Sequence, residues 1–268
     1  MGRSATRRAS PQDRTAVGGG GYVDHVTAEP DTRPGSPDGP LWDPEAIPAA
    51  TVIVLRDGPD GLETLMLKRD RDLSFAGGMW VFPGGRIDPE DRAAGGDESD
   101  LEAAARVAAV REAAEEAGIV VQPADLRRWT HWTPPPETPK RFTTAFFVAP
   151  LDDDLGEIVI DDGEIRDHRW QRPSEVIELR DQGVVGLTPP TFITLTQLLP
   201  HPDVASVLAE ADARGDDFEH FATRFEVVDA DVVAMYHGDA GYENGDASSP
   251  GARHRLRMGA RWTYQRDV

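Results

Sequence analysis

The chain has 268 residues, which is enough for one large domain or two small ones with a buried core. Its 48 acidic residues outnumber 28 basic ones, giving a formal net charge of -20, so nucleic acid is not an expected partner. Cysteine is absent and no apolar run is long enough to span a membrane, which excludes disulfides and thiol nucleophiles and favours a reducing, cytoplasmic location without a membrane partner.

Residues 1–45 are rich in Gly, Pro, Ser, Arg and Asp. Such a composition buries too little apolar surface to offset the entropy lost on ordering, so we predict a disordered tail. Order is expected to begin near Ile47. Apolar patterning then predicts three strands, over 49–55, 62–68 and 79–82.

A long alanine-rich helix is predicted to start at Leu101, because Ser99 and Glu102 match a capping box. Gly118 stands where a left-handed helix cap is expected. The helix has an apolar face of mostly small side chains, which suits close packing on a sheet. This face comprises Val107, Val110, Ala114 and Ala117.

The chain beyond this helix is predicted to contain further strands and then helices. The strands are expected over 127–132, 141–148 and 164–170, and the helices over 173–180 and 190–199. Strands on both sides of a central helix indicate a mixed sheet between layers of helices, an α/β/α arrangement. We expect one domain over 46–200, with a C-terminal extension, 201–268, packed on it.

Four charged residues lie near the end of the central helix: Arg111, Glu112, Glu115 and Glu116. Residues three and four apart share a helix face, so the glutamates form one carboxylate cluster. Such a cluster destabilises a helix unless positive charge lies among it, and a hard divalent cation prefers carboxylate oxygens. Runs of glutamate are also typical of a solvated helix face, so these residues alone leave both interpretations open.

The surrounding sequence resembles the signature of the Nudix hydrolases. The letters FPGG end at Gly85, Asp91 follows after five residues, and REAAEEAGI begins at Arg111. In that family a Glu stands at the position of Asp91, and seven residues usually precede the Arg, whereas nineteen separate Asp91 from Arg111 here. The resemblance implies a Nudix-type α/β/α sandwich and hydrolysis of a diphosphate linkage with Mg²⁺ or Mn²⁺ as cofactor.

The resemblance also implies roles for individual residues. Arg111, Glu115 and Glu164 are expected to be catalytic, with Arg111 orienting a glutamate. Glu164 is a candidate general base in the acidic stretch 161–164, which an ordinary acidic turn would equally explain. The expected metal ligands are Glu112, Glu115, Glu116 and the carbonyl oxygen of Gly85. The residues expected to bind substrate are Arg69, Arg86, Lys140 and Arg141.

The long spacing after Asp91 is similar to an insertion in a Nudix subgroup that resembles peroxisomal coenzyme A diphosphatases and their bacterial relatives. An upstream motif of that subgroup is in register except that Ala76 replaces its His. We therefore expect a nucleoside diphosphate derivative as substrate, with coenzyme A and acyl-coenzyme A as candidates. The alternatives are nucleotide sugars, dinucleotides, or a non-catalytic nucleotide sensor. The sequence leaves the oligomeric state open, with a homodimer as one option.

Overall fold

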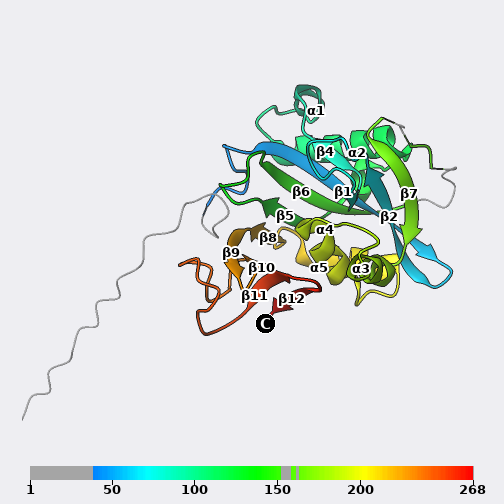
Figure 1. Cartoon of the computed structure of the whole chain (residues 1–268). Coiled ribbons are helices and arrows are strands. Elements are labelled where there is room, and N and C mark those ends of the chain that lie inside the picture. The colour runs from blue at the N-terminus through cyan, green and yellow to red at the C-terminus, as the bar shows by residue number, and fades with distance from the viewer. Residues whose placement is uncertain (1–38, 152–157, 161–162, 268) are drawn as a thin grey trace, which may run out of the picture. The chain divides into compact units, whose positions relative to one another are not determined.

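The structure of the protein, a computed structural model, describes residues 39–151, 158–160 and 163–267 (Figure 1). Residues 1–38 of the expected tail therefore lie outside the described residues. The described part begins before Ile47: Trp42 packs edge-on against His131, with ring centroids 4.7 Å apart, and Asp43 is buried.

The central sheet has eight strands and mixed directions. They run in the order β3-β2-β1-β6-β5-β8, with β4 also paired to β1 and β7 to β2. The pairs β1–β6 and β5–β8 are parallel, whereas the others are antiparallel. The strands are β1 (Ile47–Gly58), β2 (Gly61–Arg69), β3 (Trp80–Val81), β4 (Gly84–Arg86), β5 (Arg127–Thr133), β6 (Phe142–Pro150), β7 (Ile165–Gln171) and β8 (Glu219–Ala222).

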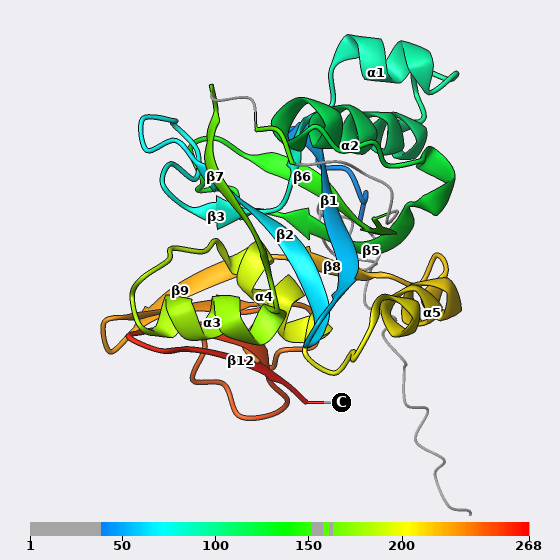
Figure 2. The same cartoon turned by 90° about the vertical axis from the view of Figure 1, so that its right-hand side faces the viewer.

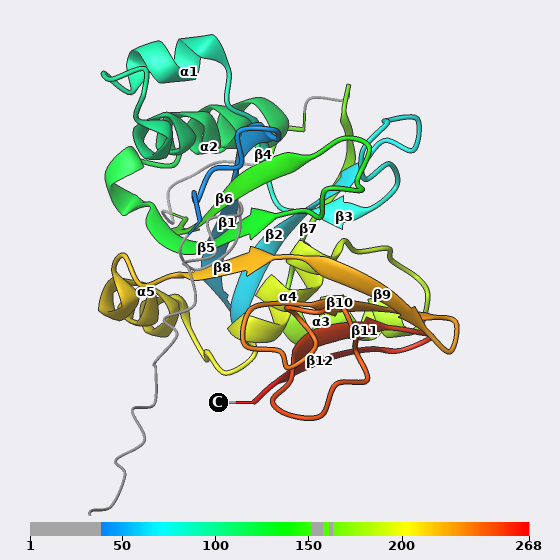
Figure 3. The same ribbon diagram turned by 90° about the vertical axis from the view of Figure 1, so that its left-hand side faces the viewer.

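Helices lie on both faces of this sheet, which confirms the predicted α/β/α layers. One face is covered by α2 (Leu101–Ala117), and α1 (Pro89–Ala94) packs on the side of α2 that faces away from the sheet, as the views from two further sides show (Figures 2 and 3). The second carries α3 (Pro173–Asp181), α4 (Pro189–Leu198) and α5 (Val204–Arg214); a short 3-10 turn, η1 (Pro123–Asp125), precedes β5.

Alternation along β1 divides the core in two. Val52 and Val54 pack on the side of α2, whereas Ile53 and Leu55 pack on the side of α4 and α5. This follows from strand geometry, because successive side chains point to opposite faces of a sheet. The sheet is therefore apolar on both faces and needs both helical layers to cover it.

Helix α2 spans the predicted residues, but two details of the prediction are wrong. Its N-cap is Asp100, whose carboxylate accepts hydrogen bonds from the N–H groups of Glu102 and Ala103, each at 3.0 Å. Ser99 instead donates its hydroxyl to Asp97. Of the predicted apolar face, Ala117 is buried but Ala114 is exposed, and the rest of the buried face is formed by alanines that were not predicted. Gly118 has a φ of 67°, as a left-handed cap requires.

The C-terminal part of the chain contributes to two sheets. Strand β8, which the sequence patterns did not predict, extends the central sheet beside β5. A second, antiparallel sheet follows in the order β12-β11-β10-β9, comprising β9 (Arg224–Val228), β10 (Asp231–Met235), β11 (His254–Met258) and β12 (Trp262–Arg266). The boundary expected at residue 200 stays a prediction. Within the described residues, no helix combines the length and apolar character that crossing a membrane requires.

Candidate active site

A cavity of about 880 Å³ opens beside the end of α2. It brings together residues that are far apart in the sequence, from β2, β4, α2, the start of β6 and the residue before β7. Of the residues predicted to form the site, it is lined by Arg69, Gly85, Arg86, Arg111, Glu112, Glu115, Glu116, Lys140 and Glu164. Arg141 is the one predicted residue that lies elsewhere, as described below.

Gly85 allows the sheet and the helix to approach closely at the site. It lies in β4, paired with Ala50 of β1, directly under Glu112 of α2. A Cβ at this position would overlap the Glu112 carboxylate, so only glycine fits without displacing that side chain. The close approach leaves the backbone of β4 within reach of whatever the glutamates bind.

Arg111 is held in place by several acceptors at once. Its Nε and Nη2 donate to the two oxygens of Asp91, at 3.0 and 2.8 Å, in a bidentate pair. Its Nη1 donates to Glu112 at 2.8 Å and to Glu115 at 2.9 Å, and Nη2 also donates to the carbonyl oxygen of Arg86. These hydrogen bonds fix the orientation of two of the three helix glutamates.

Asp91 thus has a role that the sequence did not reveal. It is buried in α1, and α1 packs on α2, so Asp91 and Arg111 meet despite the nineteen residues between them. Nothing local in the sequence signals this contact. Because the pair is bidentate and the Asp91 side chain is buried, Asp91 holds the Arg111 guanidinium in a fixed orientation in the structure.

Glu116 is the most buried carboxylate of the cluster. One oxygen accepts the backbone N–H of Gly84 at 3.0 Å, and the other lies 3.4 Å from Nη1 of Arg69. Burial, with a further contribution from the nearby charge of Glu112, raises the pKa of Glu116 to about 8 despite these partners. Burial also raises the pKa of Glu112, although Arg111 opposes the shift.

The position of the cluster at the end of α2 further disfavours its negative charge. The glutamates lie in the last two turns of α2, near the negative end of the helix dipole, and the last turn contains no basic residue. Additional positive charge at this point would therefore be strongly favourable.

We expect the metal-free protein to lose stability as the pH rises, because of Glu116. Its pKa is raised in the folded state, so its contribution to stability is complete below about pH 4.5 and is lost as the pH passes through about 8. In the presence of a chelator, the midpoint temperature of thermal unfolding should therefore fall as the pH rises from 5 to 9. Glu116→Gln isolates the contribution, because the amide cannot ionise: its midpoint should exceed that of the wild type by about 5 °C at pH 9 and match it at pH 5. A difference in midpoint between the two proteins that stays the same from pH 5 to pH 9 would contradict the raised pKa of Glu116.

Arg69 links Glu116 to the candidate base. Its Nη2 donates to Glu164 at 2.9 Å, while Nη1 faces Glu116. The Glu164 side chain is 56% exposed, so it is accessible from the cavity. The neighbouring Asp161 and Asp162 lie outside the described residues. The Nε of Arg69 is buried and has no hydrogen-bond partner among the described residues.

The other predicted basic residues lie in different surroundings. Arg86 is exposed at the edge of the cavity beside Asp88, and Lys140 lies over the ring of Phe142. Arg141 is nearly buried, and its guanidinium pairs with Asp43. Arg141 lines a second, smaller cavity, where the sequence gave no indication of a site.

The donor set suits a hard divalent cation. Carboxylate oxygens and a backbone carbonyl are the ligands that magnesium and manganese prefer, and the last turn of α2 contains no basic residue. Among the described residues, no three acidic or histidine side chains already converge on one metal position. Arg111 and Arg69 account for this, because they hold oxygens of Glu112, Glu115 and Glu116. Cation binding therefore requires these carboxylates to turn toward the ion.

The fold and the cluster define the class of protein, and the comparisons agree. A sequence model of the NUDIX domain matches residues 46–189, more than half of the chain, so the chain belongs to the NUDIX domain family. It is 28% identical over 169 residues to putative nudix hydrolase 7 of Caenorhabditis elegans, which covers 50% of this chain and 55% of that protein. The chain thus spans about half the length of this curated relative.

A solved structure supports the same fold. The crystal structure of a NUDIX hydrolase from Alicyclobacillus acidocaldarius superposes with a TM-score of 0.56 at 26% sequence identity. The match covers 62% of this chain and 96% of that one. The family match ends at Pro189, the first residue of α4, so most of the C-terminal part of the chain, including β8 to β12, lies outside it.

Proposed function

We propose that the protein hydrolyses a phosphoanhydride bond in a nucleoside diphosphate derivative, using Mg²⁺ or Mn²⁺. The observation that carries the proposal is the cluster of Glu112, Glu115 and Glu116 beside Gly85, at the wall of a cavity in a NUDIX fold. These three carboxylates and the carbonyl oxygen of Gly85 would hold the cation. When bound, it would neutralise the diphosphate and lower the pKa of a water molecule.

The chain's own residues would do the rest of the chemistry. Glu164, held by Arg69, would accept a proton from the attacking water. Arg111 would keep Glu112 and Glu115 in orientation rather than contact the substrate. The phosphate oxygens that face away from the cation need other donors. Our candidates are Arg69, Arg86 and Lys140, which line the cavity, whereas Arg141, the fourth residue predicted from the sequence, pairs with Asp43 in the adjoining cavity.

Coenzyme A and acyl-coenzyme A are our candidate substrates, on the resemblance of the motif and its long spacing. A cavity of about 880 Å³ is large enough for a nucleotide-sized ligand, since ligand pockets measure roughly 300–1,000 Å³. Ala76, at the position of the subgroup's His, weakens the support for coenzyme A relative to the support for diphosphate hydrolysis.

Product analysis tests hydrolysis of a diphosphate separately from the choice of coenzyme A as the substrate. The purified chain is incubated with coenzyme A, a nucleotide sugar, a dinucleotide and a nucleoside triphosphate, with magnesium or manganese. We expect adenosine 3′,5′-bisphosphate and a phosphopantetheine product from coenzyme A. If only the other compounds were cleaved, coenzyme A would be rejected as the substrate, but the proposed diphosphatase activity would stand. Binding without cleavage of any compound would indicate a nucleotide sensor.

A further inference from the structure

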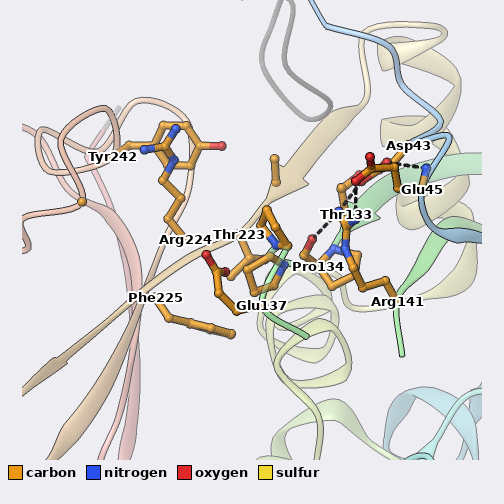
Figure 4. A pocket seen from close by; sticks show the side chains of 14 residues that line it. Asp43, Glu45, Thr133, Pro134, Glu137, Arg141, Thr223, Arg224, Phe225 and Tyr242 are labelled. Atoms are coloured by element: carbon orange, nitrogen blue, oxygen red, sulfur yellow. Dashed lines mark hydrogen bonds and ion pairs between the residues drawn. The ribbon is translucent and has the colours of Figure 1, made fainter. Parts of the chain in front are cut away.

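A second cavity adjoins the candidate active site. It measures about 430 Å³, and both cavities share four lining residues: Pro134, Pro135, Thr223 and Phe225. Figure 4 shows this smaller cavity, with Arg224 and Tyr242 on one side, Asp43 and Arg141 on the other, and Glu137 between them. The two cavities therefore adjoin at the four residues that they share.

The wall that carries Phe225 is held firmly in place. Strand β8 pairs in parallel with β5, with Ala222 opposite Thr133, and the N–H of Thr223 donates to the carbonyl oxygen of Thr133 at 3.0 Å. Phe225 then pairs with Ala234 of β10 in the second sheet. The backbone on both sides of this residue is thus fixed by sheet hydrogen bonds, although its ring is 46% exposed.

The chemistry of the smaller cavity favours a planar, uncharged ring. Phe225 and a run of prolines at 134–136 provide flat apolar surfaces, whereas Tyr242 is only 5% exposed and packs against His237. The guanidinium of Arg224 stacks over Tyr242, 4.9 Å from the ring centroid. Aromatic rings, prolines and a stacked guanidinium offer faces on which a heterocycle can stack.

The charges in this cavity disfavour a phosphate group. Asp43 and Arg141 neutralise each other. Glu45 lies 3.9 Å from Arg141 as well, and Glu137 is exposed on the lining. The three carboxylates Asp43, Glu45 and Glu137 therefore outnumber the two basic side chains of the lining, Arg141 and Arg224. An anion would be repelled, whereas the exocyclic amine of a nucleobase could donate to a carboxylate such as Glu137.

We propose that the smaller cavity binds the nucleobase of the substrate and that Phe225 is a specificity-determining residue. The part of the chain after the region matched to the NUDIX domain would thus bind the base, while the residues that act on the diphosphate lie within the matched region. This inference rests on the proposed function, because it takes the larger cavity as the place where the diphosphate binds.

The test compares binding of AMP with binding of ribose 5-phosphate, which lacks the base, by isothermal titration calorimetry. Phe225→Ala is expected to weaken AMP binding about tenfold, because a stacking surface is lost, and to leave ribose 5-phosphate binding unchanged. The control is Val227→Ala, on the same strand and face but 70% exposed and outside both cavities. It should bind both compounds like the wild type. Circular dichroism checks that both variants are folded.

Two results would overturn the inference. Equal AMP affinity in the wild type and Phe225→Ala would show that the base binds elsewhere, as would equal loss of affinity for both compounds. These outcomes differ from failure of the proposed function, in which no compound of the diphosphate panel is cleaved by the wild type. For a cleaved compound that contains a nucleobase, Phe225→Ala should raise KM about tenfold with little change in kcat.

Discussion

Glu116→Gln is expected to lower kcat about 1,000-fold or more while leaving the protein folded. Glutamine has nearly the same shape and can still accept the N–H of Gly84, so the local packing is preserved. It removes the negative charge that the proposed cation needs, at the most buried carboxylate of the cluster. Rates are measured on the best substrate of the panel, over a range of magnesium and manganese concentrations.

The matched control for this variant is Glu98→Gln, which makes the same chemical change at an exposed position before α2. It should retain wild-type kcat and metal dependence. If Glu116→Gln also retained full activity, the assignment of the glutamate cluster as the metal site would be rejected. Loss of activity in both variants would point to an effect of overall charge instead.

Asp91→Asn is expected to reduce both activity and stability. Asparagine cannot supply two anionic oxygens to Arg111, so the bidentate pair is lost and Arg111 keeps only Glu112 and Glu115 as carboxylate partners. We expect about 3 kcal/mol less stability and a kcat lowered about 10- to 100-fold, since Glu112 and Glu115 lose a fixed neighbour. Denaturant unfolding and steady-state kinetics measure the two effects.

Metal dependence distinguishes positioning from general destabilisation. If Asp91 acts through Arg111 on the glutamates, the metal concentration needed for half-maximal rate should rise in Asp91→Asn. Glu90→Gln, an exposed change in the same helix, should leave that concentration and the stability unchanged. A destabilised variant with wild-type metal dependence would mean that Asp91 merely supports the fold.

Local patterns predicted the central helix and the glutamates well, because their signals lie within a few turns of one another. The same locality explains the errors. Asp100 and Ser99 are both good caps, and the sequence cannot say which one the backbone will use. The buried face of α2 is set by how the helix lies on the sheet, and an alanine-rich helix offers little contrast between faces.

Local sequence patterns could not predict contacts between distant segments of the chain. Asp91 meets Arg111 through helix packing, and Arg141 meets Asp43, which lies in a stretch whose composition indicated a disordered tail. Phe225 gave no signal because β8 and β9 are short, and their register depends on β5 and β10. The sequence therefore located the glutamate cluster of the candidate site, whereas the long-range contacts around it could not be predicted.

The late position of β8 has a consequence for the order in which the protein can mature. Strand β8 pairs with β5 along its edge, and Phe221 of β8 stacks on Trp132 of β5 with ring centroids 4.2 Å apart. The hydrogen-bonding edge of β5 therefore stays open until residue 222 has been synthesised. A nascent chain that ends before this point would present an unpaired strand to its neighbours and invite aggregation. Shortened versions that contain only the region matched to the NUDIX domain should therefore be recovered in lower yield than the full chain.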